Sequence, residues 1–219
     1  MSIASKIQEL QNDLPKNVTL VAVSKTKPVN ALEEAYNAGQ RVFGENKIQE
    51  MVEKWEVLPK DISWHMIGHV QRNKVKYMAE FVDLIHGVDN FKLLKEINKQ
   101  AQKHNRVINC LLQIKIAEED SKFGMSAEEA TALLASEEFK QLENIAIVGV
   151  MGMATFTNDM TQVRQEFKNL KTTFNQLQPM HAALEIISMG MSGDYELAIE
   201  EGSTMVRIGS SIFGARNHL

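Results

Sequence analysis

The run Val18-Thr19-Leu20-Val21-Ala22-Val23-Ser24-Lys25 sets the pattern by which this chain of 219 residues folds. β-Branched and aliphatic residues fill the run, a lysine closes it, and Thr26-Lys27-Pro28 breaks it. Such a run predicts a buried strand, here over Thr19–Lys25. The next segment, Val29–Ala38, has the apolar spacing of an amphipathic helix, and Gly39 follows it as a stop signal. A strand followed by a crossover helix is the unit from which parallel sheets are built.

This unit recurs along the chain, without low-complexity segments or linkers rich in Pro, Gly or Ser. We expect further strands at Arg41–Glu45, Ser63–Ile67, Leu84–Val88, Ile108–Ile116, Ile145–Met151, Leu184–Met189 and Met205–Ile208. Helical patterns lie between the strands at Lys47–Trp55, Asn73–Phe81, Phe91–His104, Ala127–Glu138, Met160–Leu177 and Tyr195–Glu201. An additional helix, Ser2–Leu14, precedes the first strand.

Eight strands alternating with helices favour a closed (β/α)₈ barrel, the TIM barrel of α/β proteins, as a single domain over residues 1–219. An open, doubly wound sheet is the structural alternative. In a barrel, the functional residues gather at the carboxyl ends of the strands.

Charge and composition exclude several classes of function. The net charge of −4 and the lack of a basic block argue against a nucleic-acid partner. The N-terminus has no apolar signal segment and no run of about 18 apolar residues follows, so we expect a cytoplasmic protein with no membrane partner. Cys110 is the one cysteine, which rules out an intramolecular disulfide framework and indicates a buried structural thiol in a reducing compartment.

Lys25 is the first candidate functional residue. Because side chains alternate along a strand, Lys25 shares a face with Val23 and Val21. An amine on the inward face of a buried strand loses hydration, which lowers its pKa and makes it a nucleophile for carbonyl groups. Lys27 lies beyond the strand and we expect it to be solvated, whereas Lys115 on the fifth strand is the rival lysine.

Two loops then suggest a phosphate site. The seventh strand ends in Ser188-Met189-Gly190-Met191-Ser192-Gly193-Asp194 and the eighth in Arg207-Ile208-Gly209-Ser210-Ser211. Both loops are small and rich in glycine and hydroxyl groups, as a backbone cradle for phosphate requires, and Gly190 belongs to this predicted cofactor-binding set. The alternative is that they are ordinary turns, with Asp194 as a helix cap.

Arg207 shares a strand face with Met205 and Gly209, so its guanidinium points inward and needs an anionic or acceptor partner. The first and eighth strands are neighbours in a closed barrel, which brings Lys25 and Arg207 together. A phosphorylated aldehyde could be held by its phosphate and joined to Lys25 as an imine. Pyridoxal phosphate satisfies this, with Arg207 as the partner of its pyridine nitrogen.

Two other patterns have less bearing on function. His65 and His69 are four apart, but they flank a strand end and no third ligand is evident, so we expect polar positions near the barrel mouth and no metal site. The charged residues of the helix Met160–Leu177 are predicted to form an exposed face, made of Arg164, Glu166, Lys168 and Lys171.

At this point the chain resembles a known family, the pyridoxal phosphate homeostasis proteins, which are single-domain relatives of the alanine racemase barrel. The resemblance covers nearly the whole chain and rests on Ala22-Val23-Ser24-Lys25-Thr26-Lys27, Phe43-Gly44-Glu45-Asn46 with Gln49-Glu50, Trp64-His65-Met66-Ile67-Gly68-His69 with Gln71 and Asn73-Lys74, Lys122-Phe123-Gly124, Gly149-Val150-Met151-Gly152-Met153, and the two loops quoted above, the second continuing to Gly214. Lys47, Ile48 and Phe123 depart from the usual pattern at the rim of the site.

The resemblance implies a fold-type III barrel that binds pyridoxal 5′-phosphate as an internal aldimine on Lys25. The other contacts that it implies are to the phosphate from Ser188, Gly209 and Ser210, to the ring nitrogen from Arg207, and a polar contact from Asn46.

Three functions remain open. The first is a carrier that buffers pyridoxal phosphate and hands it to apo-enzymes, with no catalytic residue of its own. The second is a racemase or lyase of amino acids that uses the same cofactor. The third is an aldolase-type barrel that uses Lys25 on a sugar phosphate without a cofactor. We favour the carrier, and a monomer, because the chain ends at Leu219 just after the eighth strand, leaving no room for the second β-domain with which related enzymes complete their sites.

Overall fold

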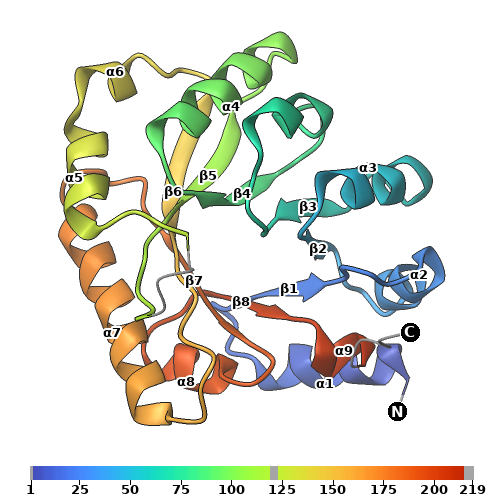
Figure 1. The fold of residues 1–219 in the computed structure, drawn as a ribbon. Coiled ribbons are helices and arrows are strands. Elements are labelled where there is room, and N and C mark those ends of the chain that lie inside the picture. The colour runs from blue at the N-terminus through green and yellow to red at the C-terminus, as the bar shows by residue number, and fades with distance from the viewer. Residues whose placement is uncertain (1, 119–122, 215–219) are drawn as a thin grey trace.

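The computed structural model describes residues 2–118 and 123–214, which fold into a closed barrel of eight parallel strands (Figure 1). The strands are β1 (Thr19–Val23), β2 (Val42–Glu45), β3 (Ser63–Met66), β4 (Leu84–Val88), β5 (Ile108–Gln113), β6 (Ile145–Met151), β7 (Ile186–Met191) and β8 (Met205–Ile208). Each strand pairs with the next, and β8 returns to pair with β1, with Val21 opposite Arg207. The barrel prediction is confirmed and the open sheet is excluded.

Helices connect the strands and surround the barrel (Figure 1). They are α1 (Ile3–Asp13), α2 (Val29–Asn37), α3 (Ile48–Val57), the 3₁₀ helix η1 (Arg72–Tyr77), α4 (Phe91–Lys103), α5 (Ala127–Ala135), α6 (Glu137–Lys140), α7 (Met160–Leu177), α8 (Tyr195–Glu200) and α9 (Ser210–Phe213). The predicted extra helix before β1 is present as α1, which packs against α2 and α9. The side chain of Asn90 caps α4, and a capping box of Ser126 and Glu129 begins α5, because side-chain oxygens satisfy the free N–H groups of a first helical turn.

Several boundaries differ from the prediction. The helix expected over Asn73–Phe81 is a 3₁₀ helix, and the one expected over Ala127–Glu138 is divided in two. Ser136 causes that division, because its backbone is extended and its hydroxyl accepts from the backbone N–H of Phe139, which starts a new helix. The strand β1 ends at Val23, two residues before Lys25.

The other differences lie at the carboxyl ends of β5, β7 and β8. β5 ends at Gln113, so Lys115 lies in the loop that follows it, and β7 begins and ends two residues later than expected. The short helix α9 after β8 was not predicted. Element ends depend on turns and packing that a hydrophobic pattern does not record.

Apolar side chains fill two regions of the core. Within the barrel, Val21, Leu84, Leu111, Met151 and Met205 form one cluster. The opposite faces of the strands pack beneath the helices, where burial of each large side chain contributes ~1.5–3 kcal/mol. Cys110 is fully buried there, and burial raises the pKa of its thiol, as expected of a structural cysteine.

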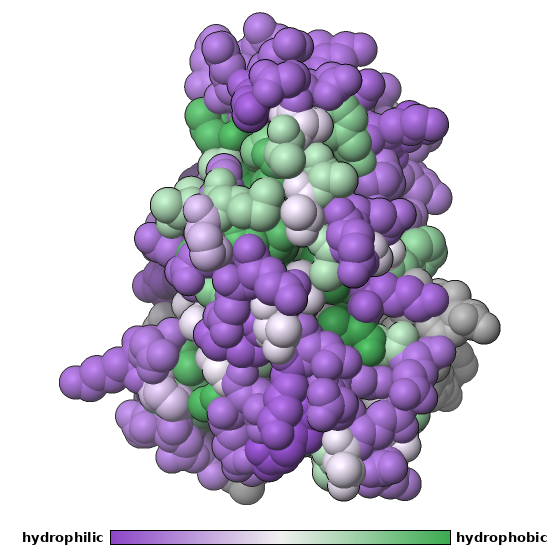
Figure 2. Space-filling view, turned by 90° about the vertical axis from the view of Figure 1, so that its left-hand side faces the viewer, coloured by the Kyte–Doolittle hydropathy of each residue, from purple (hydrophilic) through white to green (hydrophobic). Residues whose placement is uncertain are grey.

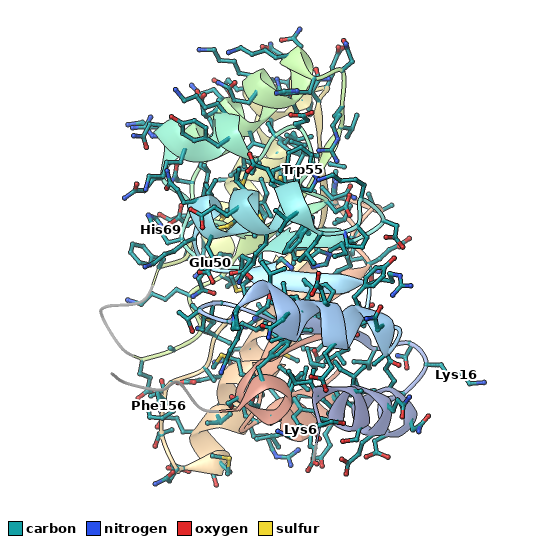
Figure 3. All side chains as sticks on the ribbon, turned by 90° about the vertical axis from the view of Figure 1, so that its right-hand side faces the viewer. Lys6, Lys16, Glu50, Trp55, His69 and Phe156 are labelled. Atoms are coloured by element: carbon teal, nitrogen blue, oxygen red, sulfur yellow. The ribbon has the colours of Figure 1, made fainter. Side chains whose placement is uncertain are left out.

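The outer surface beside α5, α6 and α7 is mostly hydrophilic, with smaller hydrophobic areas between the charged groups (Figure 2). Within residues 2–118 and 123–214, no helix is both long and apolar enough to cross a membrane. Figure 3 separates the two ends of the barrel, because His69, after β3, and Phe156, after β6, lie on the left, whereas Lys16, before β1, lies at the right-hand edge. The loops on the left therefore follow the carboxyl ends of the strands.

Candidate functional site

A cavity of about 870 Å³ lies at the carboxyl ends of the strands. Its walls come from segments that follow β1, β2, β3, β6, β7 and β8. Five of the predicted site residues line it, namely Lys25, Asn46, Arg207, Gly209 and Ser210. The cavity therefore lies where barrels place their functional groups, and it has the size of a small-molecule site.

Lys25 enters this cavity from the loop after β1 and is partly buried. Lys27 also lines the cavity, and its amine donates to the carbonyl oxygens of Phe213 and Gly214, at 2.9 and 3.1 Å. Lys115 is exposed and does not line the cavity. The structure thus places Lys25, and not its rival Lys115, beside the phosphate-type loops.

A buried group of charges supports the Lys25 loop. The amine of Lys54, on α3, lies 2.7 Å from Glu45 Oε1 and 2.7 Å from Glu50 Oε1. Burial raises the pKa of the Glu45 carboxyl, and the adjacent Lys54 opposes this by favouring the carboxylate. Sequence reasoning missed this group, although the spacing of Glu50 and Lys54 by four residues in a helix was an available signal.

Arg207 is buried at the end of β8, facing the cavity. Its Nη1 donates to Ser188 Oγ at 2.5 Å and its Nη2 donates to the carbonyl oxygen of Gly152 at 3.0 Å. Burial lowers the pKa of Arg207 to about 10, partly offset by the carboxylate of Asp194, so the guanidinium stays charged at neutral pH. Within the described parts of the chain it forms no ion pair, so an anion in the cavity would supply the missing counter-charge.

Two buried histidines stand behind Arg207. His86 Nδ1 lies 3.0 Å from Ser188 Oγ, and His86 Nε2 lies 3.0 Å from His65 Nδ1. Burial lowers the pKa of His65 to about 3 and that of His86 well below its ordinary value, so both rings are neutral.

The direction of these hydrogen bonds follows from the chemistry of Arg207. A guanidinium only donates, so Ser188 Oγ accepts from it and turns its own hydrogen toward His86 Nδ1. His86 then carries its hydrogen on Nε2 and donates to His65 Nδ1. Ser188 is buried and does not line the cavity, so in this structure it supports Arg207, and its contact with phosphate stays a prediction. The expectation that His65 is a satisfied polar residue is confirmed.

His86 was missed by sequence reasoning, although a histidine on the face of Leu84 and Val88 in an apolar strand was a signal. His69 is not part of this chain of bonds; its Nδ1 lies 3.4 Å from Asp89 Oδ2 and its ring stacks on Phe123. In the described ranges, no three His, Cys, Asp or Glu residues form a group that could hold a metal.

The two phosphate-type loops meet at Ser192. Its Oγ accepts from the backbone N–H of Gly209 at 3.2 Å and of Ser211 at 3.5 Å, and it lines the cavity beside Ser210. A side chain at Gly209 would come within 3.1 Å of the Val23 carbonyl oxygen, so only a glycine fits this close approach without a shift. Ser192 belongs to the loop predicted after the seventh strand, but no pattern in the sequence distinguishes it there as a site residue.

Gly190, near the end of β7, and Asp194, in the turn that follows, shape the end of this strand. Gly190 has a φ of +96° and a Cβ there would lie 2.7 Å from the Cβ of Ala198, so this glycine allows α8 to pack on β7 and does not line the cavity. Asp194 Oδ1 accepts from the backbone N–H of Met191 at 2.5 Å, which closes the turn. The predicted cofactor contact of Gly190 stays a prediction.

The loop after β6 forms another wall, and here one expectation is wrong. Glu166 was expected on the exposed face of α7, but it is only 3% exposed. Its carboxylate accepts from the N–H of Thr155 at 2.7 Å and from the Thr155 hydroxyl at 2.6 Å. A carboxylate can be buried where such hydrogen bonds replace its contacts with water. The Glu166 carboxylate thereby fixes the loop that carries the exposed Phe156. Lys122, which the family resemblance includes, lies outside the described residues.

A lysine and a buried arginine, which forms no ion pair within residues 2–118 and 123–214, face one cavity at the carboxyl ends of a parallel barrel. The fold and site therefore define a barrel protein that binds an anionic small molecule. The family model for the alanine racemase N-terminal domain matches residues 1–217. The chain is 40% identical over 209 residues to the pyridoxal phosphate homeostasis protein of Vibrio alginolyticus, covering 93% of this chain and 89% of that one. It is also 40% identical over 217 residues to that of Synechocystis, covering 97% and 98%. The chain therefore belongs to the pyridoxal phosphate homeostasis protein family.

Solved structures agree with this membership. PipY of Synechococcus elongatus PCC7942, solved with pyridoxal phosphate bound, superposes with a TM-score of 0.88 at 35% identity and covers 97% of this chain and 100% of its own. Alanine racemase of Clostridium difficile 630 superposes with a TM-score of 0.82 at 14% identity, over 98% of this chain and 60% of the racemase. The second likeness shows the fold alone.

Proposed function

We propose that this protein binds pyridoxal 5′-phosphate and holds it for use elsewhere in the cell. The observation that carries the proposal is that Lys25 and the buried Arg207 line one cavity, with Ser192, Gly209 and Ser210 beside them. The relatives named for pyridoxal phosphate homeostasis, and PipY with this cofactor bound, support the same ligand.

The residues fit the chemical groups of this cofactor. Arg207 is a cation without an ion pair in the described part of the chain, and it would donate to the ring nitrogen. The hydroxyls of Ser192 and Ser210 and the close backbone approach at Gly209 would hold the phosphate, and Asn46 would add a polar contact. The cofactor supplies an aldehyde that condenses reversibly with the Lys25 amine, releasing one water molecule.

A carrier role explains the site better than efficient catalysis. Arg207 donates hydrogen bonds and does not readily release a proton to a ring nitrogen, so electron withdrawal by the ring would be weak. Its relatives are named for homeostasis of the cofactor and not for a reaction. The proposal includes delivery to apo-enzymes by a monomer in the cytoplasm.

Borohydride reduction of the protein loaded with pyridoxal phosphate, followed by peptide mass mapping, tests the proposal. We expect the pyridoxyl adduct on Lys25, and its loss in Lys25→Arg. Lys115→Arg is the matched control and should keep the adduct, because Lys115 is exposed and outside the cavity. An adduct on Lys27 or Lys115, or no adduct, would contradict the assignment.

The match of residues 1–217 to the alanine racemase N-terminal domain favours one second candidate, a racemase or lyase of low activity. This function requires exchange of the α-proton of an amino acid. Mass spectrometry of amino acids incubated with the loaded protein in deuterated water distinguishes the two functions, because a carrier incorporates no deuterium above that produced by free cofactor.

A further inference from the structure

The peptide groups on both sides of Lys25 are bonded to side chains of α3. On the N-terminal side, the carbonyl oxygen of Ser24 accepts from the amine of Lys54 at 2.8 Å. On the C-terminal side, the backbone N–H of Thr26 donates to Glu50 Oε1 at 2.5 Å. Figure 3 shows Glu50 toward the side of the barrel on which His69 and Phe156 lie, where the strands end. Lys25 therefore sits in a short segment that α3 holds at both ends.

The residue after Lys25 has an unusual backbone conformation. Thr26 has a φ of +63°, in the left-handed region. This region is unfavourable for a β-branched residue, and such a conformation persists only where neighbouring groups enforce it. The hydrogen bond to Glu50 engages the backbone N–H of Thr26 from outside the loop. A strained residue next to the candidate attachment lysine is independent evidence that the loop conformation matters for function.

Charge links the two anchoring side chains to each other and to β2. The Lys54 amine bonds to both Glu50 and Glu45, and the Lys54 and Glu45 side chains are 5% and 0% exposed. The hydroxyl of Ser24 donates to the same Glu45 oxygen at 2.6 Å. Because Lys54 holds the Glu50 carboxylate in place, a change at either residue reaches Thr26.

We propose that Glu50 and Lys54 are positioning residues, which hold Ser24, Lys25 and Thr26 in the strained conformation that directs the Lys25 amine into the cavity. This inference rests on the proposed function, since it takes Lys25 as the residue to which the aldehyde becomes attached. It goes beyond that function by assigning a role to side chains that do not line the cavity.

The test separates covalent attachment from binding. In Glu50→Ala, we expect the absorbance change of imine formation with pyridoxal phosphate to be roughly ten-fold slower or more, because a small misplacement of a reacting group costs that much. The affinity for pyridoxine 5′-phosphate, which has no aldehyde, should remain within about two-fold of the original protein, because Arg207 and the phosphate loops are untouched. Glu53→Ala, at an exposed position of the same helix, is the matched control and should change neither.

A second readout needs no cofactor. Acetylation of Lys25 by acetic anhydride, measured by peptide mass mapping, should be faster in Glu50→Ala because a released loop exposes the amine. If the folded fraction of the variant equals that of the original protein, general destabilisation does not explain slower attachment of pyridoxal phosphate to Lys25 together with faster acetylation of Lys25. Glu50→Gln keeps an acceptor for Thr26 but loses the charge that binds Lys54, so its effects should be intermediate, and it serves if Glu50→Ala does not fold.

Rescue provides the decisive measurement. Thr26→Gly removes the strain, because glycine adopts a positive φ readily, so Glu50→Ala/Thr26→Gly should recover attachment to within about three-fold of the original protein. If Glu50→Ala attaches pyridoxal phosphate as fast as Glu53→Ala, or if Thr26→Gly restores nothing, the inference is wrong. If the original protein forms no adduct at Lys25, the proposed function fails instead.

Discussion

On the β1 side of the cavity, charged side chains hold the loop that carries Lys25, whereas on the β8 side neutral groups hold Arg207. Lys54 bonds to two carboxylates and a carbonyl oxygen, so its charge is balanced within the protein. Arg207 bonds to the hydroxyl of Ser188 and to a carbonyl oxygen, and in the described parts of the chain no carboxylate forms an ion pair with it. The β1 side therefore fixes a backbone conformation, whereas the β8 side leaves a positive charge available to a ligand.

Lys54→Met removes the cation of the charged cluster on the β1 side and should have the largest effect on stability. The variant leaves Glu45 and Glu50 without their cation, which should lower the free energy of unfolding by about 3–5 kcal/mol, as measured by urea titration at pH 7.5. Glu45→Gln/Lys54→Met should regain part of this loss, because it removes one of the unpaired charges. Equal urea midpoints for Lys54→Met and the original protein would show that the cluster does not stabilise the fold.

Acid should lower the stability of the protein through the buried neutral histidines on the β8 side, His65 and His86. Because the pKa values of His65 and His86 are lowered in the folded protein, the unfolded chain binds protons at these two rings at a higher pH than the folded protein does. Stability is therefore lost as the pH falls below the ordinary histidine pKa of 6.5. Between pH 7.5 and pH 5.5 we expect a loss of about 2–3 kcal/mol from the two rings, measured as the shift in urea midpoint. Glu45, with its raised pKa, acts in the opposite direction. His86→Gln isolates the histidine contribution and should reduce the loss by roughly half; an unchanged pH dependence would contradict it.

Arg207→Gln removes the positive charge on the β8 side of the cavity. Fluorescence titration should show the affinity for pyridoxal phosphate falling by about 10- to 100-fold, since a hydrogen bond from a charged donor is worth ~1.5–3 kcal/mol. The fold should stay cooperative, because the change removes the cost of burying a cation. Arg164→Gln, on the outer side of α7 where Arg164 pairs with Glu200, should leave the affinity unchanged. Unchanged affinity in Arg207→Gln would show that Arg207 does not contact the ligand.

Ser188→Ala should have the smallest effect. It removes one acceptor from Arg207 and one donor to His86, so we expect a loss of stability of about 1–2 kcal/mol and several-fold weaker binding of pyridoxal phosphate. Ser203→Ala is matched to it, because Ser203 is a buried hydroxyl that bonds to carbonyl oxygens of β7 and β8. The two variants should lose similar stability, but only Ser188→Ala should weaken binding. Equal affinities of Ser188→Ala and Ser203→Ala for pyridoxal phosphate would show that Ser188 does not contribute to binding.

The arrangement of strands and helices could be predicted from the sequence because it depends on local patterns. The apolar run before Lys25 and the seven that follow it each have the length and composition of a buried strand, and closure of the barrel follows from their number. Closure in turn places Lys25 and Arg207 on neighbouring strands. These two residues could therefore be assigned to one cavity without coordinates.

The supporting side chains could not be predicted in the same way. Glu166 lies in a helix with many charges, and its burial is favourable because Thr155 in the preceding loop, the side chain of Gln162 and the backbone N–H of Glu118 donate to its carboxylate. His86 meets Ser188 across the barrel from a strand that is not a neighbour of β7. The positive φ of Thr26 likewise depends on a carboxylate 24 residues away. Such contacts arise from tertiary closure, which a single sequence does not encode as a pattern.

The apolar cluster inside the barrel limits the routes by which a ligand can enter and leave the cavity. Val21 and Met205 precede Val23 and Arg207 on their strands, so their side chains, together with Leu84, Leu111 and Met151, close the floor beneath the cavity. A molecule that enters at the carboxyl face must leave by the same route. Under the proposed function, a protein that receives pyridoxal phosphate would have to dock at this face of the barrel, beside the exposed Phe156.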